Sequence, residues 1–265
     1  MDLQVAGKRT FVYPGGRAFD PALPAIVFIH GGAQDHCVWV LQSRYLAHHG
    51  YGVLAVDLPG HGGSAGAPLA DIEAMADWIV ALLDAAKVRT ATLVGHSMGS
   101  LIALDCAARN PERIERIALL GAAFPMRVSA ELLEAAAGDE PRAHQMINLW
   151  SHSAHAHYPS NPGPGFWVIG ENLRLMQRQK PGLLHADFAA CNDYAAGLER
   201  AAQVRCPALI VLGRRDAMTP ARSGRDLAAA IPNAKLLQIE DCGHNLMAEK
   251  PDEILDALLD FLRAR

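Results

Sequence analysis

The sequence predicts an α/β fold, a doubly wound and mostly parallel sheet with helices on both faces. Short, continuously apolar segments bounded by glycine, proline or polar residues recur along the chain, which is typical of strands buried on both faces of a parallel sheet. Segments with helical periodicity lie between them towards both ends of the chain. The 265 residues, about half of them apolar, suffice for one domain with a large core.

The individual elements follow from these apolar and amphipathic patterns. The expected strands are residues 9–14, 25–30, 52–58, 91–95, 116–121, 208–213 and 234–240. The expected helices outside the middle of the chain are residues 39–49, 71–86, 98–109, 220–231 and 251–263. In the second of these helices Ile72, Ile79 and Leu82 share one face. Pro220 and Pro251 suit the first turn of the last two helices.

The middle of the chain has a different pattern. Helical segments follow one another there without a clear strand, at residues 129–137, 142–152, 166–179 and 183–202. We therefore expect an all-helical insertion that covers the carboxyl ends of the strands, where open α/β sheets bind their ligands. The expected division is a first part of the core at 1–121, a helical cap at 122–205 and a second part of the core at 206–265.

Composition narrows the function classes. The net charge of −4 and the absence of a basic patch argue against nucleic acid as a partner. No apolar run is long enough to span a membrane, and the first residues lack the pattern of a secretory signal. The five cysteines are scattered and include no C-x-x-C pair, which argues against a disulfide framework and a metal site. We expect a cytoplasmic protein with a small-molecule substrate and no cofactor. The sequence does not indicate its oligomeric state.

A serine between two glycines stands where an expected strand gives way to an expected helix. Gly95, Ser97 and Gly99 form the pattern G-x-S-x-G, which is typical of a nucleophile elbow. Side chains at the two glycine positions would crowd such a strained turn. The amides at the start of the following helix would favour developing negative charge. Ser97 is therefore the candidate nucleophile.

A serine hydroxyl needs a base, and the base needs a carboxylate to orient it. His244 lies in a loop between the last expected strand and the last expected helix, which makes it the candidate base. Asp216 directly follows the strand 208–213 and is the candidate acid. The chain order Ser97, Asp216, His244 matches the order of one large fold. The rival carboxylates are Asp241, only three residues before His244, and three residues expected to face solvent from helices: Asp187, Asp193 and Asp226.

Two backbone amides are also needed to bind the oxyanion of a tetrahedral intermediate. One should come from Met98, the residue after the nucleophile. The other should come from the loop after the strand 25–30, with Gly32 as the first choice and Ala33 as the alternative.

The segments that carry these residues resemble the α/β-hydrolase fold, in its capped esterase, C–C hydrolase and haloperoxidase-like branch. The matching segments are "FIHGGA", "DLPGHGGS", "VGHSMGS", "LGRRDAMTP" and "DCGHNLMAEKP", which span roughly residues 9–121 and 206–265. The resemblance implies that the loop containing His61 shapes the sheet edge beside the active site and is not part of the triad. It also implies that His96 points away from the pocket.

The expected cap contains a histidine-rich run and several aromatic residues. His152, His155 and His157 form H-x-x-H-x-H, but no acidic residue or cysteine accompanies them, so a metal site is not expected. These histidines are better suited to the mouth of the pocket, together with the aromatic residues Trp150, Phe166 and Trp167.

The leading function is hydrolysis of a carboxylic ester or a related small acyl compound through an acyl-enzyme. One alternative is cleavage of a C–C bond, or a lyase reaction, by the same triad, although His96 and the "HGGA" segment depart from the pattern of C–C hydrolases. Another is a non-catalytic small-molecule receptor of the same fold. Because Ser97 occupies the nucleophile position, the dehalogenases and epoxide hydrolases that use aspartate there are disfavoured. The substrate itself cannot be read from the sequence.

Overall fold

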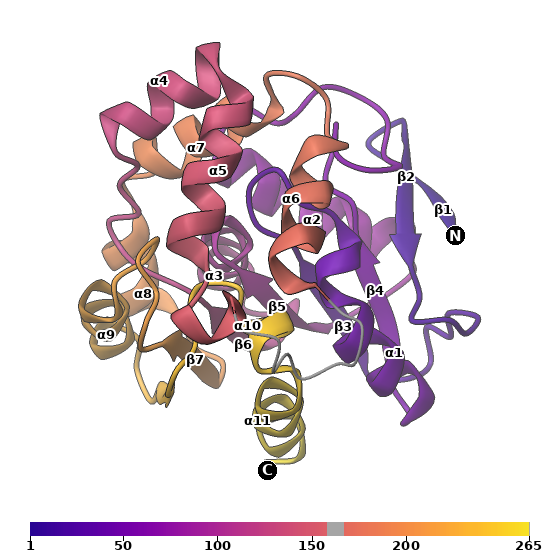
Figure 1. The fold of residues 1–265 in the computed structure, drawn as a ribbon. Helices are drawn as coiled ribbons and strands as arrows, with labels where there is room; N and C mark the ends of the chain where they lie inside the picture. Colours follow the sequence, from indigo (N-terminus) through magenta and orange to yellow (C-terminus); the bar gives the residue numbers. More distant parts are fainter. Residues whose placement is uncertain (158–166, 265) are drawn as a thin grey trace.

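The computed structural model describes residues 1–157 and 167–264, and these contain an eight-stranded, mostly parallel sheet (Figure 1). The strands are β1 (Asp2–Val5), β2 (Lys8–Tyr13), β3 (Ala25–Ile29), β4 (Gly52–Val56), β5 (Ala91–His96), β6 (Ile114–Leu120), β7 (Ala208–Gly213) and β8 (Lys235–Ile239). Their order in the sheet is β1-β2-β4-β3-β5-β6-β7-β8. β2 is antiparallel to both of its neighbours, and the other pairs are parallel. The predicted fold class is confirmed.

Helices cover both faces of the sheet because successive strand residues point to opposite sides. Val27 packs with the helices α2 (Ile72–Ala85), α3 (Met98–Arg109), α8 (Gly197–Gln203) and α9 (Ala221–Ala230) in one apolar cluster. Its neighbour Phe28 packs on the opposite face with α1 (Val40–His48), α10 (Leu246–Glu249) and α11 (Pro251–Arg263). The strands β3, β4, β5 and β7 are buried on both faces, as their continuous apolar sequences predict, whereas the edge strand β8 is partly exposed.

Every secondary-structure element described between β6 and β7 is a helix. It contains α4 (Ala130–Gly138), α5 (Glu140–Ser151), the 3₁₀ helix η2 (Ala154–His157), α6 (Val168–Gln177), α7 (Leu183–Asp193) and then α8. Figure 1 shows α4 to α7 gathered on one side of the molecule, away from α11. These helices share an apolar cluster of their own, which includes Leu132, Ile147, Met176 and Leu184 and reaches Ala33 after β3. The division into core and cap at residues 121/122 and 205/206 stays a prediction.

Several elements differ from the sequence-based expectation, among them the 3₁₀ helix η2, which was not predicted. The strand β1 was not predicted, because it has only four residues and most of them are partly exposed. The helix predicted at 183–202 is two helices, since Tyr194 leaves the helical conformation with ψ +117° and its hydroxyl donates to Asp105. The helix predicted at 39–49 is preceded by a 3₁₀ helix, η1 (His36–Trp39), capped by the Asp35 side chain. The short helix α10 was also missed.

Among the helices of residues 1–157 and 167–264, none combines the length and apolar character that a bilayer crossing requires.

Candidate active site

Ser97 occupies a strained turn between β5 and α3. Its φ of +53° and ψ of −117° are unusual for a residue with a side chain. A Cβ at Gly95 would lie 2.0 Å from the Gly99 carbonyl oxygen, and a Cβ at Gly99 would lie 2.3 Å from the Ile29 carbonyl oxygen. Only glycine fits at either position, so the spacing G-x-S-x-G has the steric cause that the sequence indicated.

Asp216 and His244 come from two loops and form a buried hydrogen-bonded pair. Asp216 follows β7, and His244 lies between β8 and α10. The His244 Nδ1 atom is 2.7 Å from Asp216 Oδ2. Burial by itself would raise the pKa of Asp216, but the charge and hydrogen bond of His244 and the contacts from Thr219 outweigh it and lower that pKa. The pair is arranged so that the carboxylate stays charged and orients the ring.

Thr219 belongs to the same network and was not singled out from the sequence. Its hydroxyl oxygen is 2.6 Å from Asp216 Oδ2 and 3.0 Å from His244 Nδ1. The backbone amides of Met218 and Thr219 both donate to Asp216 Oδ1 at 2.8 Å, which fixes the turn. The pattern Asp-x-x-Thr ahead of Pro220 is a signal of such a side-chain-to-backbone turn and could have identified Thr219.

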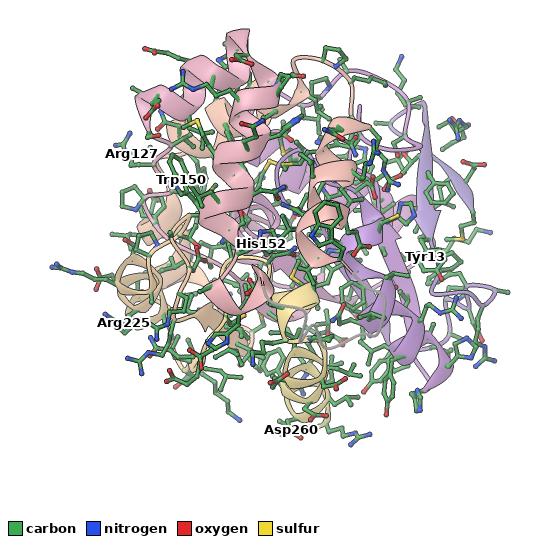
Figure 2. All side chains as sticks on the ribbon, viewed as in Figure 1. Tyr13, Arg127, Trp150, His152, Arg225 and Asp260 are labelled. Atoms are coloured by element: carbon green, nitrogen blue, oxygen red, sulfur yellow. The ribbon has the colours of Figure 1, made fainter. Side chains whose placement is uncertain are left out.

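Four of the five predicted site residues meet at one cavity of about 420 Å³, and Asp216 lies behind His244. Ser97 and His244 line it together with Gly32 and Met98. Most of the remaining wall is apolar. It comes largely from the middle segment, through Met126, Val128, Leu132, Trp150 and Phe188, and Met218 adds to it from the loop after β7. Arg127 also lines the cavity, and Figure 2 shows it on the same side of the molecule as Trp150. Segments on both sides of the expected cap boundary therefore enclose Ser97.

The loop after β3 offers one backbone amide more readily than the other. The Ala33 amide donates to Asp187 Oδ2 at 2.8 Å, so it is already engaged. Within residues 1–157 and 167–264 the Gly32 amide has no hydrogen-bond partner. Gly32 is thus the better placed of the two candidate oxyanion donors, because Ala33 is held by Asp187 of α7.

Asp187 is fully buried, so the expectation that it faces solvent from a helix is wrong. Its Oδ2 atom is 2.9 Å from His61 Nε2. Burial would lower the pKa of His61, but the Asp187 charge and hydrogen bond raise it. Helix α7 thereby ties the middle segment to the His61 loop and to the Ala33 amide. His61 contacts Asp187 rather than Asp216, which agrees with its exclusion from the triad.

The other rival carboxylates lie apart from His244. Asp193 and Asp226 are exposed, as expected. Asp241 is half-exposed, and its Oδ1 atom is 3.6 Å from both Arg215 Nη2 and His155 Nε2. Proximity in sequence to His244 therefore does not give Asp241 a contact with the ring.

The histidines of the predicted cap differ in their contacts. His152 is buried, with Nδ1 2.9 Å from the Asn148 carbonyl oxygen and Nε2 3.2 Å from Asn245 Nδ2. The exposed His155 pairs with Asp241, whereas the side chain of His157 lies outside the described residues, as does Phe166. Trp150 lines the cavity as expected, but Trp167 is 68% exposed and does not.

A smaller cavity of about 30 Å³ adjoins Ser97. Its wall includes Gln34, His96 and Asn172, none of which the sequence assigned to the site. The Gln34 side-chain amide is 3.3 Å from Asn172 Oδ1, which links the loop after β3 to helix α6. Burial and the neighbouring His244 lower the pKa of His96 to about 3, so this ring is neutral. His96 is buried, but it faces this small cavity rather than turning away.

One group within the described residues has the spacing of metal ligands. Asp35, His36 and Cys37 present ligand atoms within 4.8 Å of one another. Arg178 already contacts both Asp35 and Cys37, so a cation there would meet a guanidinium group. We assign no ion to these residues.

Comparison with known proteins shows the family of this chain. The family model of the alpha/beta hydrolase fold matches residues 24–251. The chain belongs to the α/β-hydrolase fold family. It is 31% identical over 245 residues to the pimeloyl-[acyl-carrier protein] methyl ester esterase of Chromobacterium violaceum, covering 89% of this chain and 91% of that protein.

Two further similar proteins are a longer one and one that matches over its whole length. The chain is 29% identical over 250 residues to the dihydrolipoyllysine-residue acetyltransferase component of the acetoin cleaving system of Pseudomonas putida, covering 90% of this chain and only 63% of that protein. A crystal structure of the enol-lactonase from Burkholderia xenovorans superimposes with a TM-score of 0.87 at 25% identity over the whole of both chains. The fold family and the relatives named as esterases together support hydrolase activity.

Proposed function

We propose that this hydrolase cleaves a carboxylic ester, or a related small acyl substrate, through an acyl-enzyme on Ser97. One observation carries the proposal. The strained Ser97 lines the same cavity as His244, and Asp216 holds the Nδ1 side of that imidazole at 2.7 Å. A nucleophile, a base and an orienting carboxylate are the parts that acyl transfer requires.

The proton transfers follow from the Asp216–His244 pair. Because the carboxylate can only accept, Nδ1 carries a proton and Nε2 is the basic nitrogen. In the proposed reaction Nε2 takes the Ser97 hydroxyl proton as the oxygen attacks the carbonyl carbon, and returns it to the leaving alcohol. Asp216 stabilises the imidazolium that forms between these steps. Water then repeats the sequence and releases the acid.

The proposed oxyanion donors are the backbone amides of Gly32 and Met98. Both residues line the cavity with Ser97, and Met98 is the first residue of α3. Amides at a helix N-terminus favour negative charge, and fixed donors stabilise an oxyanion without reorganising. The engaged Ala33 amide supports Gly32 as the second donor.

The walls of the cavity indicate the kind of substrate. Apolar side chains form most of the cavity wall, so we propose that an apolar acyl or alcohol group binds there. Two of the similar proteins support ester chemistry, because one is named a methyl ester esterase and the other an enol-lactonase, and a lactone is a cyclic ester. We also propose that residues 122–205 act as the cap that sets substrate size, and that the protein works in the cytoplasm.

The test combines covalent labelling with a substrate panel. A fluorophosphonate probe should label Ser97 rapidly, with Ser97→Ala as the unlabelled control, and mass spectrometry identifies the modified peptide. Hydrolysis of p-nitrophenyl esters should rise with acyl length and then fall once the chain exceeds the cavity. Absence of labelling would favour a receptor. Turnover of vinylogous 1,5-diketones in preference to every ester would favour C–C hydrolysis.

A further inference from the structure

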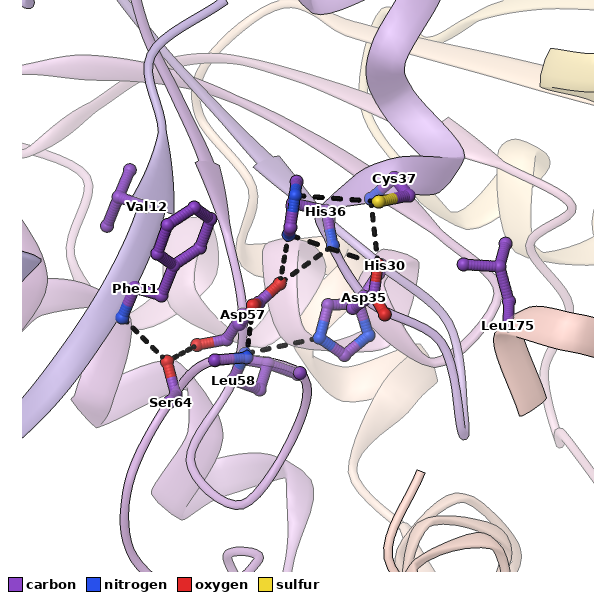
Figure 3. A network of polar contacts seen from close by, with 12 residues as sticks. Phe11, Val12, His30, Asp35, His36, Cys37, Asp57, Leu58, Ser64 and Leu175 are labelled. Carbon is purple, nitrogen blue, oxygen red and sulfur yellow. Dashed lines mark hydrogen bonds and ion pairs between the residues drawn. The ribbon is translucent and has the colours of Figure 1, made fainter. Parts of the chain in front are cut away.

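A second group of chemically reactive side chains lies at η1, which follows the loop after β3, and includes Asp57 after β4 (Figure 3). The Cys37 sulfur is 3.5 Å from His36 Nε2. On the opposite side of the same ring, His36 Nδ1 is 2.7 Å from Asp57 Oδ1. Cysteine, histidine and aspartate are thus arranged in a line, the order in which a base activates a thiol.

The buried Asp57 fixes the direction of this arrangement. Its Oδ1 atom also accepts the His36 backbone amide at 2.9 Å, and its Oδ2 atom accepts the Gly63 amide at 2.8 Å. Because the Asp57 carboxylate can only accept hydrogen bonds, His36 Nδ1 must carry a proton. Nε2 is therefore the ring atom that exchanges a proton with the Cys37 sulfur. Burial would lower the pKa of His36, but the hydrogen bonds to Asp57 and Cys37 raise it to about 10.

A second cation reaches the same sulfur from the middle segment. Arg178, which follows α6, places Nη2 3.0 Å from the Cys37 sulfur and 2.6 Å from Asp35 Oδ1. Two carboxylates also lie near Cys37 and oppose a thiolate: Asp35, which accepts from Arg178, and Glu171 on α6, which lines a cavity with Cys37. Positive charges next to a cysteine favour the thiolate, which is the nucleophilic form.

The other cysteines have no comparable surroundings. Cys106, Cys191 and Cys242 are buried. Cys206 is half-exposed, like Cys37, but burial of its thiol raises its pKa to about 11. Cys37 is therefore distinguished from Cys206 by its charged neighbours and not by its exposure, which makes Cys206 a matched internal control.

We propose that Cys37 is a reactive thiol, activated by His36 and Asp57 and assisted by Arg178, and that hydrogen peroxide and soft alkylating electrophiles modify it. In the reaction with peroxide the sulfur attacks one oxygen, so that an S–O bond forms and the O–O bond breaks. The departing hydroxide takes the proton from His36 Nε2 and leaves as water. The sulfur loses two electrons, the peroxide gains them, and a sulfenic acid remains on Cys37.

The experiment measures the reactivity of each cysteine in the folded, full-length protein. Limiting iodoacetamide at pH 7, followed by peptide mass spectrometry, gives five alkylation rates from one sample. Cys37 should react at least about tenfold faster than Cys206. With hydrogen peroxide and dimedone, which traps sulfenic acids, the adduct should appear on Cys37 before any other cysteine.

Variants separate activation from exposure. His36→Asn should slow alkylation of Cys37 about tenfold, and Arg178→Gln should slow it less, whereas Arg215→Gln at a distant arginine should leave the rate unchanged. Arg178 is half-exposed, so its variant keeps the test valid should His36→Asn impair folding. Equal rates for Cys37 and Cys206, or a Cys37 rate that both variants leave unchanged, would overturn the proposal.

Discussion

Asp216 with His244, and Asp57 with His36, form two pairs of the same geometry in different parts of the molecule. In each, the carboxylate oxygen is 2.7 Å from Nδ1. What differs is the group beyond the second ring nitrogen. For His244 it is the cavity that contains Ser97, and for His36 it is the Cys37 sulfur.

A third pair, His61 with Asp187, shows that a carboxylate and an imidazole alone do not make a reactive site. His61 places Nε2 2.9 Å from Asp187 and Nδ1 3.1 Å from the Pro59 carbonyl oxygen. Both ring nitrogens are engaged with acceptors, so the ring cannot serve as a base for a third group. A carboxylate beside an imidazole therefore does not by itself make a reactive site, because a nucleophile must face the other nitrogen.

The largest expected effect is the loss of ester turnover when the nucleophile of the Asp216–His244 pair is removed. Ser97→Ala should reduce ester turnover on the order of a millionfold, because the Asp216–His244 pair would have no nucleophile to activate. Cys37 alkylation should stay unchanged. If the variant kept more than a small fraction of the wild-type rate, the assignment of Ser97 as the nucleophile would be wrong.

The next effect tests the orienting carboxylate. Asp216→Asn should cost roughly ten-thousandfold in the turnover number, because the amide favours the wrong histidine tautomer. Asp241→Asn is the matched control on the neighbouring loop and should cost little, since its carboxylate is half-exposed and contacts Arg215 and His155. Both variants are assayed with one ester at neutral pH. The reverse ranking would reassign the acid to Asp241.

The third pair should respond in stability before activity. Asp187→Ala removes the partner of a buried His61 and should lower the free energy of unfolding by about 3–5 kcal/mol. It should also raise KM or lower kcat, because the Ala33 amide loses its acceptor and the loop of Gly32 loosens. Urea unfolding and ester kinetics measure the two effects, with the exposed Asp193→Ala as the control. An unchanged midpoint for Asp187→Ala would contradict a structural role for this pair.

The smallest expected effect is a pH-dependent change in the free energy of unfolding caused by His36. Its pKa rises from 6.5 to about 10 on folding, so the stabilisation is complete below about pH 6.5 and is lost as the pH passes 10. The difference in unfolding free energy between the wild type and His36→Asn should therefore shrink from pH 6 to pH 10. His155→Asn, at an exposed histidine, should give a small difference at every pH. A gap for His36→Asn that is constant with pH would argue against the charged pair.

Much of this architecture can be predicted from the sequence because its causes are local. The buried strands form continuous apolar runs, and α3 and α11 have the predicted bounds. The steric need for Gly95 and Gly99 is also local. Asp187 was misjudged because its partners His61 and Ala33 are 126 and 154 residues away in sequence, and a single carboxylate in a helical pattern gives no sign of them.

The contact between Ala33 and Asp187 bears on engineering within this family. A designer who exchanges residues 122–205 for the corresponding segment of a relative would replace α7 and, with it, the acceptor that fixes the loop of Gly32. A chimera of that kind would need an acidic side chain at the position of Asp187 to keep the parent's rate, even if its new pocket fitted the new substrate well.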